Sequence, residues 1–363
     1  MARNNKLKAF WTKYKLTARL KPLIVVCLVV LFVTPLRNFL LPWWPHILKQ
    51  LSTLKVIQIH LVDLFYYVDR SPYKGSCEFV HSHLASVKMP KLKDMPVYDM
   101  NDWIQQVVKI KPNLDDGSLL ILDNYKPSLS IKEQRELLFT MLSVTQALAA
   151  FNITYFISEG TLIGYWRHHG LIPWDDDADI LFDSDKWPLA KQVLSCLPDL
   201  GLYMGSDYMW KVFHKEADNW LGEQQIRFPY VDLFMYKHDN YHLWPVCIWM
   251  KTEIIVPLDW ALPVAAGVFE GYPVSIPRKT VEVLDLKFGR VDSDCYSRTF
   301  SRRERQMLPV EERTHMPCSV LKPIYPFVAR NRVDKVRGTV IEERILGSTV
   351  LSTFNTTYYG TLE

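Results

Sequence analysis

The sequence predicts an α/β (α+β) fold, in which helices pack on a sheet of short strands. Three observations favour this class. Residues 131–151 carry apolar side chains at helical spacing behind a capping box formed by Ser130 and Glu133. Residues 153–158 and 178–183 are short runs of strand-forming residues. Beyond residue 200 the pattern changes to several further short strands.

The remaining elements follow from the same patterns. Helices are expected at 162–168, at 184–197 after a capping serine, and at 278–288. The apolar run 119–122 is typical of a buried strand, and a weak helical pattern covers 331–346. We expect strands at 208–214, 223–228, 230–237, 241–246, 254–256 and 268–276.

The charge of the chain is unevenly distributed. Its 363 residues carry a formal net charge of +4, and 48% of them are hydrophobic, as in a globular protein. Residues 1–21 contain seven Lys or Arg residues and neither Asp nor Glu, whereas acidic residues outnumber basic ones in the remainder. Because the basic excess lies in one short tail, nothing in the composition indicates nucleic-acid binding.

An apolar stretch follows this basic tail. Residues 22–44 combine an uncharged run with Trp43 and Trp44, which suits a transmembrane anchor with an aromatic end. A cleavable signal peptide is the alternative, but no small-residue cleavage site follows. We therefore expect a single-pass type II protein of the Golgi or ER membrane with a lumenal catalytic domain.

Five segments are expected along the chain: a cytoplasmic tail (1–21), the anchor (22–44), a stem and N-terminal lumenal region (45–129), the catalytic domain (130–330) and a C-terminal extension (331–363). Self-association would involve the stem. Asn355 and Asn152 lie in glycosylation sequons. Six cysteines are present, and Cys27 lies in the anchor, so at most two disulfides are expected among the others.

The candidate catalytic chemistry centres on aspartates. Asp177 and Asp179 are two residues apart on a predicted strand, so both side chains lie on one face. Asp232 lies in another predicted strand and would supply a third carboxylate. Hard cations such as Mg²⁺ (or Mn²⁺) prefer oxygen ligands, so these three residues are candidate metal ligands and candidate catalytic residues.

A phosphate-binding segment is predicted just before these aspartates. Gly160 and Thr161 form a turn before a short helix, whose free N–H groups favour phosphate. Arg167 and His168 follow on that helix and are candidate phosphate ligands. Each feature alone has a simpler interpretation as a turn, a solvated acidic loop or a surface histidine, and the specificity lies in their order.

That order resembles the LicD family, which includes bacterial phosphocholine transferases, fukutin and fukutin-related protein. The resemblance covers roughly residues 130–290 and is carried by Glu159-Gly-Thr-Leu-Ile-Gly164, Arg167-His168, Gly170-Leu-Ile-Pro-Trp-Asp-Asp-Asp-Ala-Asp-Ile180 and Val231-Asp232. It implies a nucleotidyltransferase-like mixed sheet flanked by helices. It also implies transfer of a substituted phosphate from a CDP-activated donor to a glycan hydroxyl on protein or lipid.

Residue by residue, Asp177 and Asp179 match the metal pair of the family and Asp232 matches its third carboxylate, with Asp175 as an auxiliary group. Two other functions stay open at this point. One is a nucleotide-sugar glycosyltransferase that uses the Asp-x-Asp motif. The other is a non-catalytic lumenal scaffold with the same fold.

Overall fold

The computed structural model describes residues 66–251, 254–289, 291–334 and 338–357, together with residues 59, 63 and 359. By internal contacts the chain separates into two units, Met1–Leu64 and Phe65–Glu363. The description that follows concerns the second unit.

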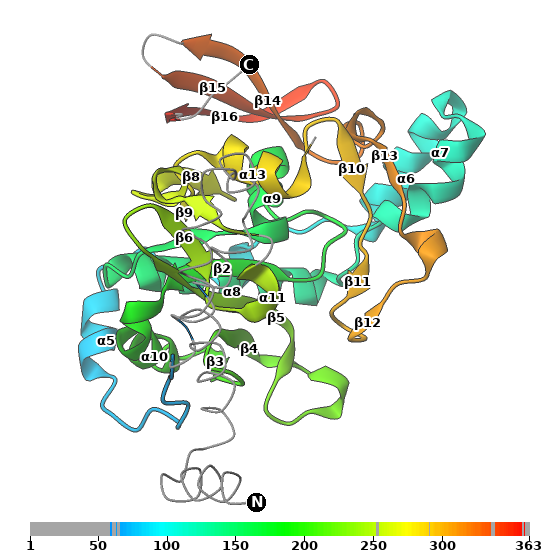
Figure 1. Ribbon diagram of the computed structural model, residues 1–363. Helices are drawn as coiled ribbons and strands as arrows, with labels where there is room; N and C mark the ends of the chain where they lie inside the picture. Colours follow the sequence, from blue (N-terminus) through cyan, green and yellow to red (C-terminus); the bar gives the residue numbers. More distant parts are fainter. Residues whose placement is uncertain are drawn as a thin grey trace, which may run out of the picture. The chain divides into compact units, whose positions relative to one another are not determined.

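The described residues form both α-helices and short 3₁₀ turns (Figure 1). The α-helices are α5 (Glu78–Leu84), α6 (Met100–Ile110), α7 (Asp116–Ile121), α8 (Ile131–Ala150), α9 (Glu159–His168), α10 (Trp187–Ser195), α11 (Ile248–Lys251), α12 (Leu258–Ala261) and α13 (Thr280–Phe288). The 3₁₀ turns are η2 (Leu92–Asp94), η3 (Lys111–Asn113), η4 (Leu122–Tyr125), η5 (Ser184–Lys186), η6 (Trp220–Gly222), η7 (Val310–Glu312) and η8 (Cys318–Val320).

The strands form one larger sheet and four small ones. The larger sheet contains β1 (Tyr155–Ile157), β2 (Ala178–Asp183), β3 (Leu200–Tyr203), β4 (Met209–Asn219), β5 (Arg227–His238), β6 (His242–Pro245) and β7 (Val256–Pro257). The small sheets contain β8 (Ala265–Phe269), β9 (Tyr272–Ile276), β10 (Asp294–Tyr296), β11 (Phe300–Ser301), β12 (Gln306–Met307), β13 (His315–Pro317), β14 (Phe327–Asp334), β15 (Thr339–Leu346) and β16 (Thr349–Thr357).

The larger sheet is mixed and carries the candidate site. Its main order is β1-β2-β5-β4-β3, with β6 on β5 and β7 on β6. The β2–β5 pair is parallel and the other pairs are antiparallel. A mixed α/β fold is therefore confirmed. The parallel pair matters most for function, because it places residues of β2 directly beside residues of β5.

Helix α8 forms the main cover of this sheet. Its start is fixed by the predicted capping box, since the Ser130 side chain accepts from the Glu133 N–H and the Glu133 carboxylate accepts from the Ser130 N–H. Apolar side chains of α8 pack against β4 and β5. Of the 20 residues of α8, 15 are buried, so this helix lies inside the unit rather than on its surface.

Two disulfides tie distant segments to this core. Cys77 is bonded to Cys196, and Cys295 is bonded to Cys318. Cys247 is a buried free thiol. This agrees with the expected limit of two disulfides outside Cys27, which lies outside the described residues.

Several predictions of secondary structure are wrong, including the strand expected at 223–228, of which only residues 227 and 228 belong to β5. The run 119–122 belongs to α7 and η4 rather than to a strand, and Leu120 is 84% exposed while Leu122 is buried. Within the segment 331–346, residues 331–334 belong to β14 and residues 339–346 to β15, not to a helix. In β15 the inward positions are Val340 and Glu342, so a buried carboxylate interrupts the apolar alternation that marks a strand.

The expected transmembrane anchor is also corrected. Within the described part of the chain, no helix combines the length and the apolar character needed to cross a membrane. The segment 22–44 itself, like the tail before it and residues 45–58 of the expected stem, lies outside the described residues.

Candidate active site

The start of helix α9 lies directly against the start of strand β2. The Asp179 N–H donates to the Thr161 Oγ1 at 2.7 Å, and the Ser158 N–H donates to the Asp179 carbonyl oxygen at 3.1 Å. A Cβ on Gly160 would lie 2.7 Å from the Asp175 Oδ2, so glycine at this position leaves room for that carboxylate. The Gly-Thr pair therefore positions two aspartates at the helix start.

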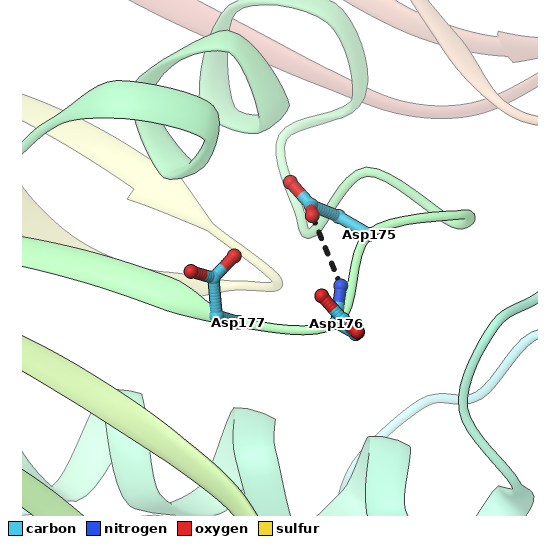
Figure 2. A group of neighbouring side chains, drawn as sticks. All are labelled: Asp175, Asp176 and Asp177. Carbon is cyan, nitrogen blue, oxygen red and sulfur yellow. Dashed lines mark hydrogen bonds between the residues drawn. The ribbon is translucent and has the colours of Figure 1, made fainter. Parts of the chain in front are cut away.

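Three consecutive aspartates occupy the loop that leads into β2. Figure 2 shows the side chains of Asp175, Asp176 and Asp177, with the Asp176 N–H donating to the Asp175 Oδ1 at 3.0 Å. This local bond orients the Asp175 carboxyl group. One carboxylate oxygen from each of the three residues lies within 4.8 Å of the others.

A second carboxylate group spans the parallel strands. Asp179 on β2 lies opposite Asp232 on β5. Together with Asp177 they place one oxygen each within 4.8 Å of one another, and all three side chains are buried. The three side chains expected to converge do lie together, but Asp177 comes from the loop just before β2 rather than from the strand itself.

Burial makes the negative charge of this cluster costly. Burial first, then repulsion from Asp177 and Asp176, raises the pKa of Asp175 to about 8. Burial and the neighbouring carboxylates also hold the pKa of Asp179 well above its usual range. Burial raises the pKa of Asp232 as well, although the Lys211 ammonium opposes this. The cluster therefore favours bound protons or an added positive charge.

Three side-chain cations already contact the cluster. The Lys211 Nζ lies 2.6 Å from the Asp232 Oδ1. On a segment far along the chain, the Arg302 Nε lies 2.6 Å from the Asp177 Oδ2, and the Arg298 Nη1 lies 2.7 Å from the Asp176 Oδ2. The three ion pairs reduce the charge of the cluster without exhausting its carboxylate oxygens.

A cavity of about 590 Å³ opens beside the carboxylates. Asp175, Asp177 and Asp179 line it, whereas Asp232 is not among its lining residues. Its walls also include the α9 residues Glu159 and Gly160, the ion-paired Lys287 of α13, and aromatic side chains. These aromatic residues are Trp174, Phe234, Trp249, Phe288, Tyr296 and Phe300. A cavity of this size accommodates a nucleotide-sized ligand.

The two predicted phosphate ligands on α9, Arg167 and His168, lie in different surroundings from each other. Arg167 lines the cavity, but its guanidinium donates to the Val291 and Asp294 carbonyl oxygens. His168 is fully buried, its Nδ1 lies 2.7 Å from the Pro326 carbonyl oxygen, and burial lowers its pKa to about 3. His168 therefore does not fit the phosphate-binding role expected from the sequence. The sequon residues Asn152 and Asn355 are both exposed.

Four basic residues of the site did not emerge from sequence reasoning. They are Lys211, Lys287, Arg298 and Arg302. Lys211 has a local signal, because β4 pairs with β5 and Lys211 lies opposite Asp232. The two arginines have none, since more than a hundred residues separate them from the aspartates that they contact.

The residues present fit a divalent cation. Asp177, Asp179 and Asp232 offer only carboxylate oxygens, which Mg²⁺ and Mn²⁺ prefer. Burial, followed by repulsion from neighbouring carboxylates, raises the pKa of Asp179, and burial raises the pKa of Asp232, so a cation bound here would stabilise their ionised forms.

The part of the chain that contains these aspartates is similar to a known protein family. Residues 152–279 match the model of the LicD/FKTN/FKRP nucleotidyltransferase domain. An uncharacterized protein of Rickettsia prowazekii is 31% identical over 129 residues, which cover 32% of this chain and 48% of that protein. The lipopolysaccharide cholinephosphotransferase LicD of Haemophilus influenzae is 40% identical over 60 residues, 16% of this chain and 23% of that enzyme. The chain thus spans about half, or less, of the relatives it matches.

Among solved structures, the lincomycin-bound lincosamide antibiotic adenylyltransferase LnuA aligns with 43% of this chain and 85% of its own, at 14% identity and a TM-score of 0.28. A similarity at that level supports no argument about fold or function. The expected Golgi or ER membrane location is not supported: no membrane-spanning helix occurs among the described residues, and the relatives named above are bacterial proteins.

Proposed function

We propose that the protein is a metal-dependent phosphotransferase, because residues 152–279 match the model of the LicD/FKTN/FKRP nucleotidyltransferase domain. It moves a substituted phosphate, of the polyol-phosphate or phosphocholine type, from a CDP-activated donor to a hydroxyl group of a glycan. The observation that carries the proposal is the convergence of Asp177, Asp179 and Asp232 beside a nucleotide-sized cavity.

The roles of the carboxylates follow from their positions. Asp177, Asp179 and Asp232 hold the cation, which when bound shields the diphosphate charge and draws electron density from the reacting phosphorus. Lys211, on the neighbouring strand, forms an ion pair with Asp232 and fixes the position of its carboxylate. Glu159 and Gly160, at the start of α9, line the same cavity, and the free N–H groups of a helix start favour a phosphate group.

The proton of the acceptor hydroxyl needs a base within hydrogen-bond reach. Asp175 lines the cavity, whereas Asp232 is paired with Lys211 and does not line it. We therefore assign proton removal to Asp175. The acceptor oxygen forms a bond to the donor phosphorus, the bond from that phosphorus to CMP breaks, and CMP leaves with both electrons of that bond.

The proposal is tested by a donor screen read out as CMP release. Purified protein is incubated with CDP-choline, CDP-glycerol and CDP-ribitol, each with Mg²⁺ or Mn²⁺ and with a panel of glycan acceptors. We expect CMP from one of these donors, none in the presence of EDTA, and a loss of at least about a hundredfold for Asp177→Asn.

UDP-sugars and GDP-sugars serve as the comparison arm of the same screen. Turnover of these donors, with no CMP from any CDP compound, would show a nucleotide-sugar glycosyltransferase instead. Asp183→Asn is the matched control. Asp183 ends the same strand β2, its side chain accepts from the Asp185 N–H, and an asparagine side chain can also accept there.

A further inference from the structure

A disulfide-closed segment brings an arginine to the carboxylate centre. Cys295 and Cys318 are bonded to each other, and the residues between them include β11, β12 and the arginines at 298, 302, 303, 305 and 313. Both cysteines are buried in a cluster with Trp103, Tyr125 and Trp174. The two ends of the segment are therefore fixed to the core.

The backbone of this segment is also fixed next to the aspartates. The Arg302 N–H donates to the Asp176 Oδ2 at 3.0 Å. The neighbouring Arg303 guanidinium makes two hydrogen bonds to the Glu133 carboxylate, at 2.6 and 2.8 Å. Glu133 is the capping residue of α8, so the segment is tied to the most buried helix of the described unit. Because its backbone is held by these contacts, Arg302 can move only through its side chain.

The Arg302 side chain occupies the mouth of the carboxylate cluster. Its Nε lies 2.6 Å from the Asp177 Oδ2, it is 33% exposed, and it lines the cavity. Burial alone would lower the pKa of Arg302, but the charges of Asp177, Asp179, Asp175 and Asp232 outweigh burial and raise it. The guanidinium therefore interacts electrostatically with the same four carboxylates that would attract a bound cation.

A guanidinium and a divalent cation repel each other when they share these carboxylates. A long arginine side chain on a fixed backbone can turn to another partner within the cavity, which Arg302 lines together with Arg298, Thr299 and Phe300. A diphosphate in that cavity offers the planar, bidentate partner that a guanidinium prefers.

We propose that Arg302 exchanges partners during donor binding. Without a cation it pairs with Asp177; when the cation takes Asp177, Arg302 turns to the diphosphate of the CDP compound and becomes a donor-binding residue. This inference rests on the proposed function and assigns to the same site a residue that lies outside the matched domain, 152–279.

The proposal predicts that one variant binds the metal ion more tightly and the nucleotide more weakly than the wild type. Arg302→Ala removes the competitor for Asp177, so MnCl₂ alone should bind about tenfold more tightly than to the wild type. The same variant lacks the phosphate partner, so CDP in saturating Mg²⁺ should bind about tenfold more weakly. Arg302→Lys keeps the charge but not the bidentate geometry, and both effects should be smaller.

Isothermal titration of the full chain measures both affinities, and thermal unfolding verifies that each variant is folded. Arg305→Gln is the control, because Arg305 lies on the same segment and stacks on Trp220 at 5.4 Å. It should change neither affinity. If Arg302→Ala weakens both ligands, or leaves both unchanged while the wild type binds them, the exchange is refuted. If the wild type binds neither MnCl₂ nor CDP, the proposed function fails together with this inference.

Discussion

Replacing Asp175 by asparagine should make the protein more stable and less active. Asp175 is half-buried beside Asp176 and Asp177, whose carboxylates repel its negative charge. Asparagine keeps the oxygen that accepts from the Asp176 N–H and removes the ionisable group. The change therefore separates the electrostatic cost of the cluster from its hydrogen bonding.

The magnitude follows from proton linkage. The pKa of Asp175 is raised from 3.8 to about 8 in the folded chain. The folded state keeps a proton that the unfolded state releases, so the contribution to stability is complete below pH 3.8 and is lost as the pH rises toward 8. One such proton changes the free energy of unfolding by about 1.4 kcal/mol per pH unit. Between pH 5 and pH 7 the wild type should lose as much as about 3 kcal/mol relative to Asp175→Asn.

Urea denaturation at pH 5, 6 and 7, with EDTA present, measures this difference directly. The curves of wild type and Asp175→Asn should diverge as the pH rises, with the variant more stable at pH 7. The same variant should lose CMP release in the donor screen. Parallel pH dependences in the two proteins would refute the electrostatic reasoning.

Three further substitutions test how the site is held. Thr161→Val leaves the buried N–H of Asp179 without its acceptor, which should cost about 1–3 kcal/mol of unfolding free energy and weaken Mn²⁺ binding in a titration. Lys211→Met leaves the Asp232 charge unpaired and should cost about 3–5 kcal/mol by urea denaturation, while a second change of Asp232 to asparagine should restore most of it. Gly164→Ala would place a Cβ 2.4 Å from a backbone carbonyl oxygen, and we expect a loss of about 1–3 kcal/mol in the same assay.

The sequence predicts those parts of the fold whose signals are local. The start of α8 is marked by a capping box, and β2 by a run of strand-forming residues, so both were located within a residue or two. The C-terminal strands were missed for a physical reason. Glu342 faces inward, where it forms an ion pair with Arg330 and contacts His169, both far away in the chain, so the alternation of β15 does not look apolar.

The residues of the candidate site likewise fall into those that a local sequence signal predicts and those that no local signal predicts. Asp177, Asp179 and Asp232 can be found because strand periodicity fixes their faces, and the β2–β5 register then brings them together. The positions of Arg298 and Arg302 depend on a disulfide-closed segment whose path no local pattern encodes. Long-range ion pairs of this kind become visible only in the folded chain.

The central claim is that carboxylates from two adjacent strands hold a divalent cation. Its most direct test is the binding of Mn²⁺ alone, followed by electron paramagnetic resonance, to the wild type, Asp179→Asn and the control Asp183→Asn. We predict one saturable site in the wild type and the control, and at least tenfold weaker binding in Asp179→Asn. No saturable site in the wild type, or equal binding by all three proteins, would contradict the account.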